Sequence, residues 1–225
     1  MPDTLKSTVQ RLLEESADGT LPSIVQAGHP ALRMPSEPWE GQLEPSELTA
    51  LIDLMRHTMH AAPGVGLAAP QLGLPLQLAV LEDLYPVTED VATLRERHPL
   101  EFFAVLNPHY EPLGSPGEPE DSNPELPGDP AMFYEFYEGC LSVSGWQAVV
   151  PRHRRVTLHY TEPDGTLRER TFSGWQARIV QHETDHLAGT LYLDKALLRS
   201  LSSNSEYTHR WAHPGIEAAR QGLGF

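Results

Sequence analysis

Two histidines and a glutamate, residue types that bind and use divalent metals, lie in the short segment 182–186 (HETDH). At about 100° per residue, His182 and His186 lie one turn apart on the same face of a helix, so their imidazoles project side by side. Trp175 and Ile179 share that face, and Glu183 lies next to it. In this pattern two neutral imidazoles hold the metal while the glutamate, which is not a ligand, takes a proton from water. We therefore predict a metal site on this helix, the alternative being a helix with two buried histidines.

The identity of a third ligand decides which kind of metal protein this is. A zinc peptidase of this pattern takes its third ligand from downstream of the helix, but no recognisable third-ligand pattern is present there. Cys140 is the only cysteine of the chain and the softest ligand available, and with two histidines it would leave one coordination position open for water. As a nucleophile, Cys140 would need a base and would leave both histidines unexplained. A zinc peptidase and a non-catalytic metal-binding module stay open at this point, and the downstream candidate ligands are Asp194, Glu206, His209 and His213.

Three motifs in the order GVGLAAPQ (64–71), EGCLS (138–142) and QHETDHLAGTLYLDK (181–195) resemble those of the peptide deformylases. The segment that begins at Ile24 (IVQAGHPALRMPSEP) is similar to the opening segment of that family, and the resemblance continues to about Arg199. It implies an α+β fold in which antiparallel strands pack around a central helix that bears the HExxH motif. It also implies a hydrolase that removes the N-formyl group from the formylmethionine of newly made bacterial or organellar proteins and releases formate.

The resemblance also implies a role for each motif residue. Cys140, His182 and His186 would bind one divalent metal, Fe²⁺ in the cell, with Zn²⁺, Ni²⁺ or Co²⁺ able to replace it. Water activated at the metal would attack the formyl carbon, with Glu183 as general base and then general acid. A site with one thiolate acidifies water less than a three-histidine site, which gives Glu183 more of the deprotonation to do.

Further residues of the motifs would contact the substrate. The side chain of Gln71 and the backbone N–H of Leu141 would bind the formyl oxygen, and Gly64 and Gly66 would lie along the bound peptide. Trp146 would wall part of the pocket. We expect Glu138 to contact a ligand, Gly139 to allow close backbone approach, and one short strand to carry both Cys140 and Leu141. Ser144 departs from the proline that many family members have, which leaves the shape of the rim open.

The composition limits the partners of the chain. It has 225 residues, 40% of them hydrophobic, which suffices for one large domain, and a formal net charge of −15, which opposes binding to phosphate backbones. It shows neither a signal peptide nor an apolar run of about 20 residues. We expect a cytoplasmic protein that binds N-formylmethionyl nascent peptides and transiently contacts the ribosome, with no membrane and no specific nucleic acid as partner.

Apolar periodicity predicts two further helices. Leu5, Val9, Leu12 and Leu13 form a short one within an N-terminal extension (1–23), which precedes a catalytic domain (24–199) and a C-terminal tail (200–225). A longer helix follows Pro45 and ends near 61–63, with its apolar stripe in the core. Strands are expected at 76–81, 102–107, 146–150 and 154–160, the last in a hairpin with 167–172. The Pro- and acid-rich segment 111–130 is expected to be a surface insert, and the basic cluster 151–155 (PRHRR) a solvated face.

Overall fold

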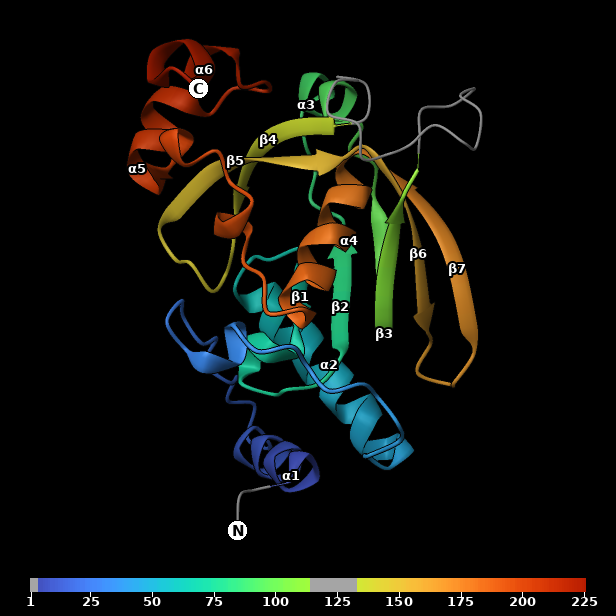
Figure 1. Cartoon of the computed structure of the whole chain (residues 1–225). Coiled ribbons are helices and arrows are strands. Elements are labelled where there is room, and N and C mark those ends of the chain that lie inside the picture. Colours follow the sequence, from blue (N-terminus) through green and yellow to red (C-terminus); the bar gives the residue numbers. More distant parts are fainter. Residues whose placement is uncertain (1–3, 114–132) are drawn as a thin grey trace.

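The computed structural model describes residues 4–113 and 133–225. Its strands form two antiparallel sheets, and one helix lies centrally between them (Figure 1). The fold class predicted from the sequence, α+β with antiparallel strands around the HExxH helix, is confirmed. The larger sheet has the order β1-β2-β3-β6-β7 and the smaller has the order β4-β5-β8. The strands are β1 (Gly66–Ala68), β2 (Leu78–Asp83), β3 (Leu100–Pro112), β4 (Phe133–Gly139), β5 (Trp146–His153), β6 (Arg155–Thr161), β7 (Leu167–Ser173) and β8 (Ser202–Ser203).

The central helix is α4 (Gly174–Leu187), and it contacts strands of both sheets (Figure 1). Its C-cap is Ala188, and Gly189 follows with φ 74°, a left-handed conformation that glycine adopts without strain. A Cβ at this position would also lie 2.8 Å from the carbonyl carbon of Arg33. Gly189 therefore ends the helix.

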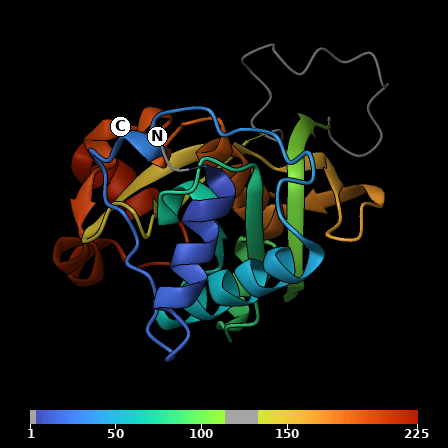
Figure 2. The same ribbon diagram turned by 90° about the horizontal axis from the view of Figure 1, so that it is seen from below.

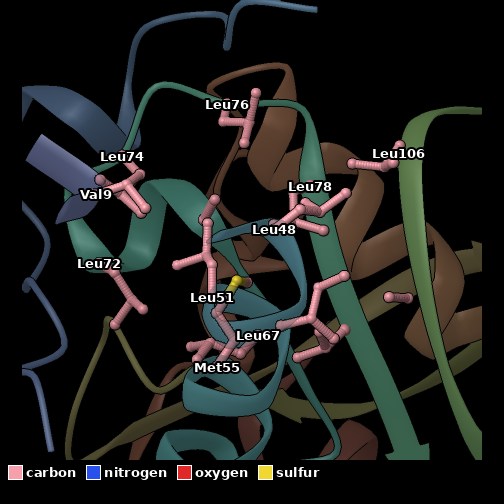
Figure 3. Close-up of a cluster of buried hydrophobic side chains, with 14 of the residues drawn as sticks. Val9, Leu48, Leu51, Met55, Leu67, Leu72, Leu74, Leu76, Leu78 and Leu106 are labelled. Carbon is pink, nitrogen blue, oxygen red and sulfur yellow. The ribbon is translucent and has the colours of Figure 1, made fainter. Parts of the chain in front are cut away.

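Helices α1 (Leu5–Glu15) and α2 (Pro45–Ala61) lie together below the larger sheet (Figures 1 and 2). α2 begins with a capping box between Glu44 and Glu47, and its apolar stripe is buried, as predicted. α1 buries Val9 completely in the same cluster, close to Leu74 (Figure 3). Burial of these side chains fixes α2 against β1 and β2, and hence the position of the loop that leads into β1.

The predicted hairpin of β6 and β7 is confirmed, with Arg155 opposite Ser173 and Thr161 opposite Leu167. Other predicted boundaries were wrong. β2 begins and ends two residues later than expected, and β3 is longer, so that it includes Glu111 and Pro112, which were assigned to the surface insert. Residues 114–130 of that insert lie outside the described residues. β4 was not predicted, because its FYEFYEG pattern has little apolar alternation.

The C-terminal region packs onto the smaller sheet. It contains α5 (Asn204–Glu206), a π-helical turn (Tyr207–Trp211) and α6 (Glu217–Leu223). Ile216 and Ala219 are buried there in a cluster with Phe136, Tyr137 and Val149 of β4 and β5. Among residues 4–113 and 133–225, no helix is long and apolar enough to cross a membrane.

Candidate functional site

Three potential metal ligands converge where α4 passes the end of β4. Ligand atoms of Cys140, His182 and His186 all lie within 4.8 Å of one another, and the Cys140 Sγ is 3.2 Å from the His186 Nε2. The prediction that a strand carries Cys140 was wrong. Cys140 follows β4 directly and begins the turn toward β5. α4 presents both imidazoles, with ring centroids 5.0 Å apart, to this turn.

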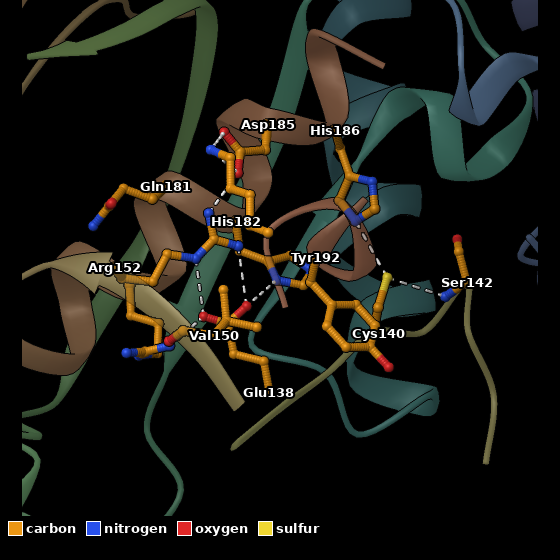
Figure 4. Close-up of polar contacts among 12 residues, drawn as sticks. Glu138, Cys140, Ser142, Val150, Arg152, Gln181, His182, Asp185, His186 and Tyr192 are labelled. Atoms are coloured by element: carbon orange, nitrogen blue, oxygen red, sulfur yellow. Dashed lines mark hydrogen bonds and ion pairs between the residues drawn. The ribbon is translucent and has the colours of Figure 1, made fainter. Parts of the chain in front are cut away.

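Glu138 fixes the orientation of the first histidine. Its Oε2 lies 3.1 Å from the His182 Nδ1, which leaves the Nε2 of that ring to bind a metal (Figure 4). Arg152 donates from two nitrogens to the Glu138 carboxylate, each at 3.0 Å, and Arg178 donates to it as well. Burial alone would raise the pKa of Glu138, but the two guanidinium groups hold that pKa well below its ordinary value. Glu138 therefore stays ionised and accepts a hydrogen bond from the His182 Nδ1.

Arg152 corrects the prediction for the basic cluster 151–155. That cluster was expected to face solvent, yet Arg152 is only 2% exposed and also pairs with Asp185 of α4 (Figure 4). Lys195 pairs with the same carboxylate, at 2.7 Å. Arg152 therefore links β5, the end of β4 and α4 through two carboxylates.

Glu183 lies beside the metal-ligand cluster with one carboxylate oxygen, Oε2, buried and without a hydrogen-bond partner among the described residues. Burial raises the pKa of Glu183 to about 7. The carboxyl group lies directly against Gly66 of β1, where a Cβ would be 2.6 Å from the Glu183 Cγ. An unpartnered carboxylate oxygen with a pKa near 7 has the proton affinity expected of a general base or acid.

Gln71 is buried and held in one orientation beside Cys140. Its Oε1 accepts from the Ala68 N–H at 2.8 Å, so its NH₂ group points the other way, 3.3 Å from the Ser142 Oγ and 3.7 Å from the Cys140 Sγ. The N–H of Leu141 has no acceptor among the residues the structure describes. The Gln71 NH₂ group thus contacts Cys140 and Ser142, the two residues on either side of Leu141.

The turn that carries Leu141 is fixed by Gln26. Its side-chain NH₂ donates to the Leu141 carbonyl at 3.0 Å, and its Oε1 accepts from the Ser144 N–H at 3.2 Å. A proline at position 144 has no N–H and could not make the second bond. The departure at Ser144 therefore supplies a contact to the rim rather than removing one.

A cavity of about 840 Å³ opens onto this cluster. It is lined by His182, Glu183 and Gln71 and by predicted substrate-contacting residues. A Cβ at Gly64 would lie 2.8 Å from the Leu141 Cδ1, so the loop before β1 closes tightly over the turn after β4. The lining includes Gly64, Gly66, Cys140, Leu141 and Trp146.

The downstream candidate ligands lie elsewhere. Asp194 accepts from Arg33 and from the Leu191 N–H, and none of the four candidates belongs to either metal-ligand cluster found in residues 4–113 and 133–225. The second cluster consists of His109, Glu111 and His159 on the larger sheet. The third ligand that a zinc peptidase would take from downstream of α4 is thus not in place.

Comparison with known proteins agrees with this geometry. Residues 21–201 match the family model described as polypeptide deformylase. The chain belongs to the polypeptide deformylase family. It is 49% identical to peptide deformylase 3 of Streptomyces avermitilis over 100% of this chain and 95% of that relative, and 48% identical to peptide deformylase 1 of Streptomyces coelicolor over 98% and 93%. Deformylases are enzymes, and this chain is one of them.

Solved deformylase structures share the fold. A class I type b peptide deformylase from Acinetobacter baumannii, bound to the compound K3U, has a TM-score of 0.61 and 28% identity, and the similarity covers 79% of this chain and 99% of that one. The peptide deformylase from Thermotoga maritima has a TM-score of 0.58 and 29% identity, covering 79% and 98%.

Several residues of this deformylase site were missed by sequence reasoning. Arg152, Arg178 and Asp185 surround Glu138 and its neighbours, and Ser142 contacts Gln71. Alternation along β5 offered one signal, because Arg152 shares a strand face with the buried Val150. A charged residue on a buried face requires a buried partner, but the partner itself could not be named from the sequence.

Proposed function

We propose that this chain removes the N-formyl group from the formylmethionine of newly made proteins and releases formate. One observation carries the proposal: Cys140 and His182 of the ligand cluster, the buried carboxyl group of Glu183, and the two donor-bearing residues Gln71 and Leu141 all line a single cavity. Amide hydrolysis requires an activated water, a proton carrier and stabilisation of the developing oxyanion. Each of these requirements has a residue or ligand set at that place.

The donor set fits a divalent transition metal. A thiolate and two imidazoles suit borderline ions, and three protein ligands leave a coordination position open. Cys140, His182 and His186 would hold the ion, which we propose to be Fe²⁺, with Zn²⁺, Ni²⁺ or Co²⁺ fitting the same donors. When bound, the ion supplies Lewis acidity, which polarises the formyl carbonyl and acidifies water.

Glu183 moves the proton. In its ionised form its unpartnered Oε2 accepts a proton from the attacking water, and the same atom then donates that proton to the departing amine of methionine. A pKa near 7 favours both steps at neutral pH, because the carboxyl group is then neither a very weak base nor a very weak acid. Gly66 allows the carboxyl group to occupy this position, because a Cβ at residue 66 would overlap with it.

Gln71 and Leu141 stabilise the negative charge that develops on the formyl oxygen. The bond from Ala68 to the Gln71 Oε1 holds the side-chain amide with its NH₂ toward the site before substrate arrives. The N–H of Leu141 is free to donate beside it. Donors fixed in advance are effective because they need no reorganisation during the reaction.

The peptide itself lies in extended form along the cavity. β1 and β4 are edge strands of the two sheets, and Gly66 and Gly139 at their ends both line the cavity. An edge strand offers unpaired backbone groups to an added strand. An extended peptide can therefore lie along these strands. We propose that the substrates are nascent N-formylmethionyl chains, met in the bacterial cytoplasm during transient contact with the ribosome.

The test is anaerobic purification, metal analysis and measurement of formate released from formyl-Met-Ala-Ser. We expect one metal ion per chain and formate release, with no cleavage of internal peptide bonds. Cys140→Ser should lose metal and activity together, because a hydroxyl ionises poorly and is a hard ligand. Glu183→Gln should keep the metal while turnover falls by about 10² or more. The matched control is His57→Ala, which alters an exposed histidine of α2.

Three results would each overturn a part of the proposal. A Cys140→Ser protein with normal metal content would remove Cys140 from the ligand set. Cleavage of internal peptide bonds without formate release would favour a peptidase, and metal binding without either activity would favour a binding module.

A further inference from the structure

The cavity wall extends beyond the part of the chain that defines the family. The family model matches residues 21–201, yet Asn204 and Tyr207 line the same cavity as Cys140 and Glu183. Trp146, at the start of β5, also lines this cavity and is 47% exposed. The C-terminal region, expected from the sequence to be a tail, therefore contributes to the substrate cavity.

The first part of this region is held to the smaller sheet. Ser203 of β8 pairs with Trp146, and the Asn204 N–H donates to the Gly145 carbonyl at 2.8 Å. The Asn204 Oδ1 accepts from the side-chain amide of Gln147 at 3.1 Å. These bonds place Asn204 directly beside the turn that leads from the metal-ligand cysteine into β5.

Tyr207 is held by aromatic packing and by the residues that follow it. Its ring centroid lies 4.8 Å from that of Tyr137, next to Glu138 on β4. Farther along, Arg95 donates to the carbonyl oxygens of His213 and Pro214, at 3.2 and 3.0 Å, and Ile216 is buried. Contacts on both sides of Tyr207 therefore hold this segment in position, so the rings of Trp146 and Tyr207 are in place without substrate.

We propose that Trp146, Asn204 and Tyr207 form a binding subsite for the peptide residues that follow the formylated one, and that it favours an aromatic or aliphatic side chain there. Two partly exposed rings offer apolar contact area, and the amide of Asn204 offers hydrogen bonds to a peptide backbone. The occupant follows from continuity, because these residues line the same cavity as Cys140 and Glu183, and the bond from the Asn204 N–H to Gly145 places them beside the turn that carries Leu141. The proposal rests on the proposed function and adds a preference to it.

The test compares substrates that reach the subsite with one that does not. In the full-length, metal-loaded enzyme, Tyr207→Ala should lower kcat/KM for formyl-Met-Ala-Phe and formyl-Met-Phe-Ala by about three- to tenfold, the range expected for loss of one aromatic contact. The value for formyl-methionine amide should stay within about twofold. Tyr207→Phe keeps the ring and should behave as the parent, and Asn204→Ala, which changes an exposed side chain, should show the same dependence on peptide length.

The matched control is Thr208→Ala, an exposed neighbour in the same π-helical turn that does not line the cavity. It should leave kcat/KM unchanged for the longer substrates and for formyl-methionine amide. Equal losses on short and long substrates, or no loss on either, in both Tyr207→Ala and Asn204→Ala would overturn the subsite.

A binding measurement separates this proposal from the proposed function. Calorimetry with the unformylated peptide Met-Ala-Phe should show affinity that falls by a similar factor in Tyr207→Ala. Affinity that depends on Tyr207 in a protein that releases no formate would overturn the proposed function and support the subsite. Formate release with no dependence on Tyr207 in either assay would support the proposed function and overturn the subsite.

Discussion

At the scale of single residues, the position of the Glu183 carboxyl group depends on the lack of a side chain at Gly66. Glu183 lies against the backbone of β1, and position 66 accommodates it only as glycine. Gln71 depends on its neighbours in a similar way, because the N–H of Ala68 decides which end of its amide faces Cys140. Position and orientation, rather than residue type alone, make these groups available for chemistry.

Gly66→Ala should displace the Glu183 carboxyl, because the new methyl group would overlap with it. We expect deformylation to fall by about 10², similar to the loss in Glu183→Gln, since both changes remove the proton carrier from its place. Metal content should stay normal, because His182 and His186 are untouched. Formate release and metal analysis on the same sample check this, with His57→Ala, a change of an exposed histidine of α2, as control. Parent-like turnover in Gly66→Ala would contradict the placement of Glu183.

Gln71→Leu should lose turnover for lack of an oxyanion donor, by about 10²–10³. The loss should appear in kcat and leave KM little changed, because the bond strengthens only in the transition state. The variant should also be less stable by about 1–3 kcal/mol, since the buried N–H of Ala68 loses its acceptor. Steady-state kinetics and urea unfolding measure the two effects. A kcat within a few-fold of the parent would exclude the amide from the oxyanion site.

At the scale of elements, the site is assembled where three of them meet. β4 ends at Gly139, α4 supplies both histidines, and β5 supplies Arg152, which bonds to carboxylates on each of the other two. The ligand cluster is therefore only as well positioned as the contacts between these elements. The buried arginine is the residue that all three have in common.

Arg152→Met should cost about 3–5 kcal/mol of unfolding free energy, because it leaves Glu138 and Asp185 buried with fewer partners. The control Arg168→Met breaks an exposed pair with Glu162 on the neighbouring hairpin and should cost at most about 1 kcal/mol. Chemical unfolding of both variants at fixed metal loading measures the difference. Equal losses in the two variants would show that burial of the Arg152 network does not matter for stability.

At the scale of the whole molecule, buried carboxylates of this strongly acidic chain pair with bases from distant segments. Glu82 of β2 accepts from Arg56 and His60 of α2 and is 5% exposed. The hydrogen bond from Arg56 is the main reason that the pKa of Glu82 is lowered from its ordinary value of 4.5. Protonation of this group in acid should therefore loosen the contact between α2 and the larger sheet.

Glu82→Gln should consequently destabilise the protein most at neutral pH. A carboxyl group whose pKa is lower in the folded state adds stability that is fully present above its unfolded pKa of about 4.5, and that is lost as the pH falls through the folded value. The difference in unfolding free energy between parent and variant should shrink as the pH is lowered from 7 to below 4. Urea unfolding across this range measures it, and a difference that grows in acid would contradict the pairing.

Features that depend on neighbours in the chain could be predicted from the sequence. The helical positions of His182 and His186, the end of α4 at Gly189 and the hairpin of β6 and β7 all follow from spacing within a few residues. The motifs around Cys140 and Gln71 also indicated the family, because their order along the chain is distinctive. Local geometry repeats wherever these spacings occur, so it needs no knowledge of the fold.

Features that depend on which distant segments meet were decided only by the tertiary structure. The sequence showed Arg152 as one of several bases in a polar cluster, whereas the fold buried it between Glu138 and Asp185. It showed Asn204 and Tyr207 in a tail, whereas packing of Ile216 brought that region to the cavity. The physical reason is the same in both cases: the free energy of burying a charge or an apolar side chain depends on the surface that covers it, and here that surface comes from elsewhere in the chain.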